Sequence, residues 1–131
     1  MVCLDTSFLV DLLRGKEDVR TMLDILQERA EEMSVATPSI MELSKGASLG
    51  NNPLEEKEKI QRLFSSLLVL NFDRECAVKA GEIEADLRKK GQMIEIEDIM
   101  IAAIALQHGE SLVTRNIKHF EKIEGLKIEG Y

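Results

Sequence analysis

The sequence predicts an α/β fold, a parallel sheet of four to five strands with helices on both faces. Short apolar runs of strand type alternate with longer stretches of helical periodicity along the chain. Residues 99–106 are almost all apolar, which indicates an interior helix, and Gly109 then leads directly into the apolar run 111–114. A buried helix followed by a buried strand is half of a parallel βαβ unit, and right-handed crossovers place helices on both faces of the sheet.

In chain order, the apolar runs predict strands at residues 2–4, 34–36, 69–72, 111–114 and 126–128, the last at an edge. Helical spacing predicts helices at residues 8–14, 17–33, 54–67 and 99–106, one from Thr37 onward, and a long one ending near Lys90. Thr37 is expected to cap a helix with Pro38 in its first position, and Asp73 to cap the long helix that Gly91 stops. Residues 116–121 predict a turn or a short helix.

The composition favours one domain, residues 1–131. A hydrophobic fraction of 44% excludes disorder, and the net charge of −7 argues against a plain nucleic-acid-binding module. It does not argue against an enzyme whose acids hold divalent cations. Asp5, Asp11 and Arg14 interrupt the N-terminal apolar segment, so we expect no signal peptide or membrane span and a cytoplasmic location. Cys3 and Cys76 lack CxxC spacing and are expected to be reduced thiols.

Two acids stand at the points where helices are expected to start. Asp5 directly follows the strand at residues 2–4, and Asp98 opens the helix that contains residues 99–106. Acids at these positions commonly cap a helix or stabilise its dipole. They also suit the crevice at the carboxyl ends of parallel strands, where such sheets bind ligands. Both interpretations stay open for each residue.

Glu42 lies in the second turn of the helix that follows the strand at residues 34–36. It matches a capping box with Ser39, in which the glutamate would satisfy a backbone donor. Pro38 argues against this interpretation, because proline in the first helical position makes Thr37 the cap. Glu42 is then free to act as a ligand.

Parallel strands end at one edge of the sheet, so Asp5, Glu42 and Asn116 are expected to converge there. Asp98 joins them if its helix begins at the same edge. Three carboxylates and an amide oxygen would repel one another unless a hard divalent cation lay among them. Mg²⁺ or Mn²⁺ suits oxygen ligands, and such a site suits phosphodiester hydrolysis.

A zinc site is not expected. His108 and His119 each follow a helix or turn, and neither has a second ligand at metal spacing. The ligand set predicted from the chain therefore consists of oxygen atoms.

Several short segments, spread over essentially the whole chain, also carry a family resemblance. They are Leu4-Asp5-Thr6-Ser7, Glu42, residues 98–103, residues 112–116 with His119-Phe120, and Gly125-Leu126. Their order and spacing resemble the PIN-domain ribonucleases and, within that family, the VapC toxins of toxin–antitoxin pairs. The resemblance implies a PIN-like three-layer fold and a metal-dependent endoribonuclease.

By this resemblance, Asp5, Glu42 and Asp98 are the carboxylates that hold Mg²⁺ or Mn²⁺ and support catalysis. Asn116 lies where many members have a fourth acid. An asparagine can still supply an oxygen ligand and so completes the expected catalytic and metal set, but it adds no charge. The number of bound ions therefore stays open.

Four neighbouring residues are expected to support these ligands. Thr6, Ser7 and Thr114 would orient ligands or water, as the resemblance implies. Arg115 lies in the loop after the strand at residues 111–114, and we expect it to contact the substrate. The family further implies an RNA substrate, a homodimer, and a VapB-type antitoxin whose basic segment reaches the acidic site.

Other functions stay open at this point. Asn116 keeps open a PIN fold that has lost catalysis and serves as a binding protein, although the other three acids are intact. A nuclease that processes RNA without an antitoxin, or a flap-type nuclease that acts on DNA, would keep the same acids. A response-regulator receiver shares the architecture but needs adjacent acids after its first strand and a lysine after its last. Here Asp5 stands alone, and Arg115 is the nearest base.

Overall fold

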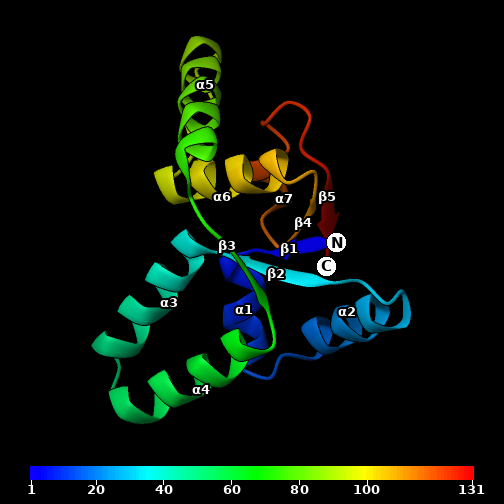
Figure 1. Cartoon of the computed structure of the whole chain (residues 1–131), viewed down its shortest axis with the longest axis vertical. Coiled ribbons are helices and arrows are strands. Elements are labelled where there is room, and N and C mark those ends of the chain that lie inside the picture. Colours follow the sequence, from blue (N-terminus) through cyan, green and yellow to red (C-terminus); the bar gives the residue numbers. More distant parts are fainter.

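A computed structural model describes the whole chain, residues 1–131. Its centre is a five-stranded parallel sheet with the strand order β3-β2-β1-β4-β5 (Figure 1). The strands are β1 (Val2–Leu4), β2 (Met33–Ala36), β3 (Leu68–Leu70), β4 (Ser111–Thr114) and β5 (Ile128–Gly130). In the central pair, Leu4 lies opposite Val113. The predicted fold class is confirmed, and all five strands end at one edge.

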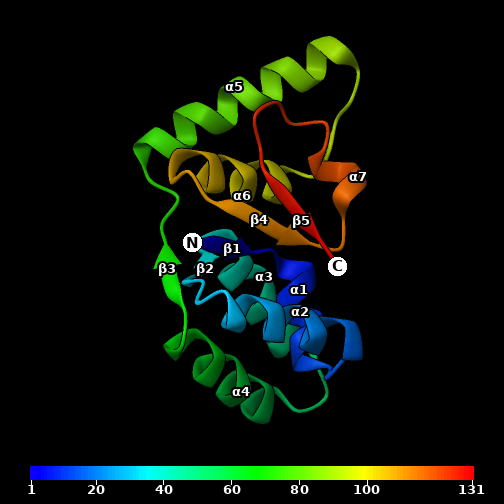
Figure 2. The ribbon, with the colours of Figure 1, turned by 90° about the vertical axis from the view of Figure 1, so that its right-hand side faces the viewer.

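Helices cover both faces of this sheet, as Figure 2 shows from the side. The helices are α1 (Thr6–Leu13), α2 (Glu17–Glu28), α3 (Thr37–Leu49), α4 (Pro53–Ser65), α5 (Arg74–Lys90), α6 (Ile96–Gln107) and α7 (Ile117–Phe120). The first four lie on one face and the last three on the other (Figures 1 and 2). Two hydrophobic clusters fill the layers, and alternate residues of β1 enter different clusters, Cys3 one and Val2 and Leu4 the other.

Helix α6 lies between the sheet and α5, which explains its composition (Figure 2). Ile99, Ile101 and Ile104 are at most 1% exposed, and the alanines between them are fully buried. A helix covered on all sides has no need of a polar face. The predicted interior helix is therefore confirmed.

Helix α2 ends at Glu28, so the predicted extension to residue 33 is wrong. Ala30 adopts a left-handed backbone with φ of 54°, which turns the chain out of the helix. Met33, whose spacing also fitted the helical face, instead begins β2 and pairs with Val2. An apolar residue fits both the helical and the strand period. Here its pairing with β1 places Met33 in a strand.

Several other boundaries shift by one or two residues, and α6 begins at Ile96 in place of the predicted 99. Helix α1 begins at Thr6, β3 covers Leu68–Leu70 and β5 covers Ile128–Gly130, in place of the predicted 8, 69–72 and 126–128. The predicted cap at Thr37 is also wrong, because Ala36 holds the N-cap position. The Thr37 hydroxyl instead accepts a hydrogen bond from the backbone N–H of Phe72 at 3.1 Å. It ties the chain after β3 to the start of α3.

Helix α5 has the predicted ends. The Asp73 carboxylate accepts a hydrogen bond from the backbone N–H of Cys76 at 3.0 Å, and Gly91 adopts a φ of 66°. Cys76 and Cys3 are buried free thiols, as expected. No helix of the chain combines the length and the apolar character needed to cross a membrane.

A buried acid, Glu110, lies at the edge of the sheet opposite the carboxyl ends. Its side chain is 3% exposed, and its Oε1 accepts a hydrogen bond from the Ser34 hydroxyl at 2.8 Å. Its Oε2 is buried without a hydrogen-bond partner. Burial raises the pKa of Glu110 above its ordinary value of 4.5, because the charged form loses its hydration.

We therefore expect Glu110→Gln to stabilise the protein at pH 7 by on the order of 1 kcal/mol. A carboxyl whose pKa is raised by folding destabilises the fold above that pKa and has no such effect below the unfolded value. The gain should therefore disappear as the pH falls to about 4.5. Urea unfolding from pH 4 to 8, with the exposed Glu58→Gln as control, measures it. A gain that does not change with pH would contradict the proposed cause.

Candidate active site

The candidate site lies at the carboxyl edge of the sheet. Asp5 follows β1, Glu42 lies in α3 after β2, and Asn116 follows β4. Helix α6 leads into β4 at the opposite edge, so its first turn, with Asp98, lies toward the carboxyl edge. The sheet thus brings together residues that are far apart in the sequence.

Asp5 is 2% exposed, and two hydroxyl groups hold its carboxylate. Its Oδ2 accepts hydrogen bonds from Ser7 Oγ at 2.8 Å and Thr114 Oγ1 at 2.7 Å. Asp5 holds the N-cap position of α1, yet its side chain makes no capping hydrogen bond. Its Oδ1 is buried without any hydrogen-bond partner. A fixed carboxylate with one unused buried oxygen is a suitable cation ligand.

Glu42 does not form the capping box with Ser39, because α3 begins two residues before Ser39. Its Oε1 accepts a hydrogen bond from Thr6 Oγ1 at 2.9 Å, and the Ser39 hydroxyl lies 2.9 Å from the same Thr6 oxygen. Burial raises the pKa of Glu42, and the charges of Glu97 and Asp5 raise it further. The negative charge of Asp5 therefore acts on the Glu42 carboxylate.

Asp98 does not open its helix, because α6 begins at Ile96 with Glu95 in the N-cap position. Asp98 lies in the first turn, and its Oδ2 is 3.5 Å from His119 Nδ1. Burial and then the charge of Asp5 raise the pKa of Asp98 to about 6, with Glu42 adding to the shift and His119 opposing it. The three predicted carboxylates thus act on one another electrostatically.

The hydroxyls of Thr6, Ser7 and Thr114 all donate to these carboxylates. Thr114 also accepts a hydrogen bond from the backbone N–H of Asn116 at 2.9 Å. The Asn116 backbone is therefore fixed beside Asp5, while its side chain is partly exposed.

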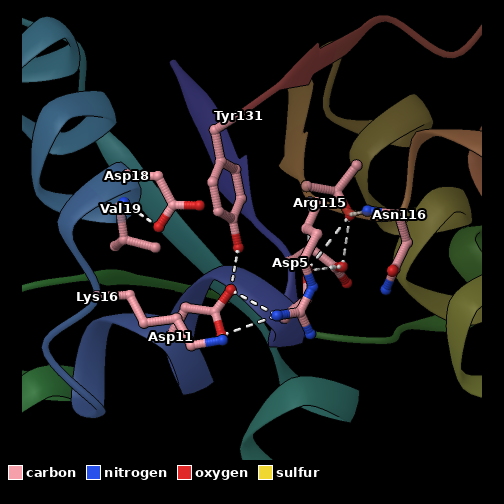
Figure 3. Close-up of polar contacts among 10 residues, drawn as sticks. Asp5, Asp11, Lys16, Asp18, Val19, Arg115, Asn116 and Tyr131 are labelled. Carbon is pink, nitrogen blue, oxygen red and sulfur yellow. Dashed lines mark hydrogen bonds and ion pairs between the residues drawn. The ribbon is translucent and has the colours of Figure 1, made fainter.

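The Arg115 side chain points toward Asp11 (Figure 3). Its Nη1 donates to both carboxylate oxygens of Asp11 at 2.9 Å. The Tyr131 hydroxyl donates to Asp11 Oδ2 at 2.9 Å, and Lys16 Nζ lies 3.4 Å from Oδ1. Burial alone would raise the pKa of Asp11, but these partners lower it below its ordinary value.

The parts that Asp11, Tyr131 and His119 play around this site were not predicted from the sequence. Asp11 follows Phe8 by three residues, on the face of α1 that packs inward, and such a buried acid calls for a partner. This signal was available in the sequence. The contacts of Tyr131 and His119 arise from tertiary packing alone.

The oxygen atoms present fit a hard divalent cation, because Asp5 Oδ1 is buried and unpaired beside two further carboxylates. As the side chains stand, no three Asp, Glu, His or Cys side chains have the spacing of a closed metal site. An ion that keeps several water ligands needs only part of its shell from the protein, as Mg²⁺ commonly does.

A cavity of about 650 Å³ adjoins Thr6 and Glu42 and extends between α1, α3 and α4. Arg14 and Lys45 line it, so basic side chains lie next to the acidic centre. Of the three predicted carboxylates only Glu42 lines this cavity, and Glu56 is a second acid in its wall.

This geometry defines a class of protein, the α/β domains that carry an acidic centre at the carboxyl edge of an all-parallel sheet. The chain belongs to the PIN domain family, whose family model matches residues 2–126. It is 32% identical to the tRNA(fMet)-specific endonuclease VapC of Salmonella typhimurium, over 98% of this chain and 96% of that protein.

Solved structures show the same similarity. VapBC2 from Rickettsia felis, bound to a DNA fragment from its promoter, matches with a TM-score of 0.91 and 26% identity, over 100% of this chain and 99% of that chain. DNA-bound VapBC from Salmonella typhimurium matches with a TM-score of 0.88 and 30% identity, over 99% and 98% of the two chains. The PIN-like fold expected from the sequence is thereby confirmed.

We expect Asp98→Asn to stabilise the metal-free protein at pH 8 by on the order of 1 kcal/mol. The pKa of Asp98 is raised from 3.8 to about 6, so its ionisation destabilises the fold above about pH 6. The gain should fade as the pH falls from 6 toward 3.8, where wild type is protonated too.

Thermal unfolding in EDTA between pH 3.8 and 8 measures this gain. Asp24→Asn on the exposed side of α2 is the matched control and should change nothing. A variant that is less stable than wild type at pH 8 would show that Asp98 serves the helix start and not an acidic cluster.

Proposed function

We propose that this chain is an Mg²⁺- or Mn²⁺-dependent endoribonuclease that acts as the toxin of a VapBC-type toxin–antitoxin pair. The observation that carries the proposal is the buried Asp5 carboxylate. Its Oδ1 has no hydrogen-bond partner, and its charge raises the pKa of both Glu42 and Asp98. The ribonuclease and VapBC names of the similar proteins support the same class.

In this proposal Asp5, Glu42 and Asp98 hold the ion, and Asn116 adds an amide oxygen. A divalent ion in such a site polarises the phosphate and lowers the pKa of the attacking water. Since only three of the four residues carry charge, the set fits one tightly held ion better than two.

The residues around the acids prepare these ligands. Ser7 and Thr114 both donate to Asp5 Oδ2 and so leave Oδ1 available, while Thr6 fixes one oxygen of Glu42. Hydroxyls orient carboxylates without neutralising them, so the cluster keeps its attraction for a cation. Two of the three proposed carboxylate ligands, Asp5 and Glu42, are therefore already oriented by hydroxyl groups.

Basic residues at the rim are proposed to receive the RNA backbone. The Arg115 side chain is 46% exposed although one nitrogen is paired with Asp11, so further N–H groups remain for a phosphate. Arg14 and Lys45 are two further basic side chains, which line the cavity beside Glu42. These side chains offset, locally, the repulsion expected from a chain with a net charge of −7.

The proposed partners follow from the same features. The net charge of −7 favours a basic protein partner, and a VapB-type antitoxin with a basic segment would be attracted to the acidic edge. The solved VapBC complexes to which this chain is similar support such a partner. The homodimer implied by the resemblance belongs to the same proposal.

We expect Asp5→Asn and Glu42→Gln each to reduce RNA cleavage by more than about 100-fold. Changes in residues that merely orient ligands cost about 10–100-fold in comparable sites, and loss of a ligand should cost more. The assay follows cleavage of a mixed RNA pool by purified, antitoxin-free protein with Mg²⁺, Mn²⁺ or EDTA. Asp24→Asn is the matched control and should cleave as wild type does.

Two outcomes would overturn parts of this proposal. Cleavage by Asp5→Asn at the wild-type rate would show that the chemistry occurs elsewhere. Absence of cleavage by folded wild type, with every metal tried, would favour a PIN fold that binds a partner without catalysis, the reading that Asn116 keeps open.

A further inference from the structure

Asp11 is a buried acid that the proposed chemistry does not use. It lies on α1, and its side chain is 1% exposed. Arg115, Tyr131 and Lys16 all reach it (Figure 3). The Tyr131 ring is held in turn by an edge-to-face contact with Phe8, at 5.2 Å between ring centroids. This packing gives Asp11 a fixed orientation.

Arg115 is anchored at the acidic centre by its backbone. Its N–H lies 3.4 Å from Ser7 Oγ, and Ser7 donates to Asp5 Oδ2 at 2.8 Å. Its neighbour Thr114 also donates to Asp5. The Arg115 backbone is thus separated from Asp5 by a single hydroxyl, a distance that an arginine side chain can span.

A guanidinium beside several carboxylates is expected to pair with them, because charge-assisted Arg–carboxylate bonds are strong. At this site such a pair would occupy the oxygens proposed to bind the ion and would cancel part of their charge. The structure instead shows Arg115 paired with Asp11.

We propose that Asp11 is a positioning residue that holds the Arg115 guanidinium off the metal-binding carboxylates. This inference rests on the proposed function. Asp11 keeps Asp5, Glu42 and Asp98 free for a divalent cation, and it leaves Arg115 at the rim, where its remaining N–H groups face a substrate phosphate. Tyr131 supports Asp11 through the hydroxyl hydrogen bond.

The test is the affinity for Mn²⁺, measured by calorimetry on metal-free wild type, Asp11→Asn, Arg115→Gln and the double variant. We expect Asp11→Asn to bind Mn²⁺ at least about tenfold more weakly, because the released Arg115 competes for the same oxygens. The double variant should return to within about threefold of wild type. Arg115→Gln alone should bind Mn²⁺ as wild type does.

Rescue by the second substitution separates this role from a structural one. If the Asp11–Arg115 pair only stabilises the fold, removal of Arg115 as well will not restore Mn²⁺ binding, and that result would overturn the inference. Tyr131→Phe covers the case in which Asp11→Asn fails to fold, because it keeps the ring contact with Phe8. It should weaken Mn²⁺ binding in the same direction, again reversed by Arg115→Gln.

The failure of this inference differs from the failure of the proposed function. Equal Mn²⁺ affinity in wild type, Asp11→Asn and Tyr131→Phe would refute the role of Asp11 and leave the metal site standing. No Mn²⁺ binding by wild type would remove the metal site itself, and the inference with it.

Discussion

The parallel pairing of β1 with β4 is the constraint on which the rest of the site depends. With Leu4 opposite Val113, the next residues along the two strands place the Asp5 carboxylate against the Thr114 hydroxyl. A shift of one residue in this register would set Asp5 opposite a residue whose side chain lies on the other face of the sheet. The buried strands and α6 hold the register, so the hydrophobic core sets the geometry of the acids.

Two of the acids at this edge, Asp5 and Glu42, accept hydrogen bonds from uncharged hydroxyl groups, which do not neutralise the carboxylates. Burial and the charges of Asp5 and Glu42 raise the pKa of Asp98, so this cluster of like charges is costly to the fold. A bound cation would relieve this cost. The nearby guanidinium of Arg115 is already paired with Asp11, which keeps this internal competitor away from the acids. Stability and affinity for a cation are therefore opposed at this site.

The sequence predicted the parallel α/β class and the interior helix because apolar periodicity reports burial directly. It also predicted that Asp5 and Glu42 lie at one edge of the sheet, because each follows an apolar run whose end is visible in the sequence. It misplaced the end of α2, because Met33 satisfies both the helical and the strand period. It could not predict the contact of His119 with Asp98, because long-range packing sets that contact.

The central claim is that a divalent ion binds at Asp5 with Glu42 and Asp98 around it. Anomalous diffraction from crystals of the antitoxin-free protein soaked in Mn²⁺ locates such an ion directly. We predict a peak about 2.1 Å from Asp5 Oδ1, a usual distance for a small hard cation, that is absent from Asp5→Asn crystals treated alike. A peak that persists in the variant, or that lies only at another part of the surface, would contradict the claim.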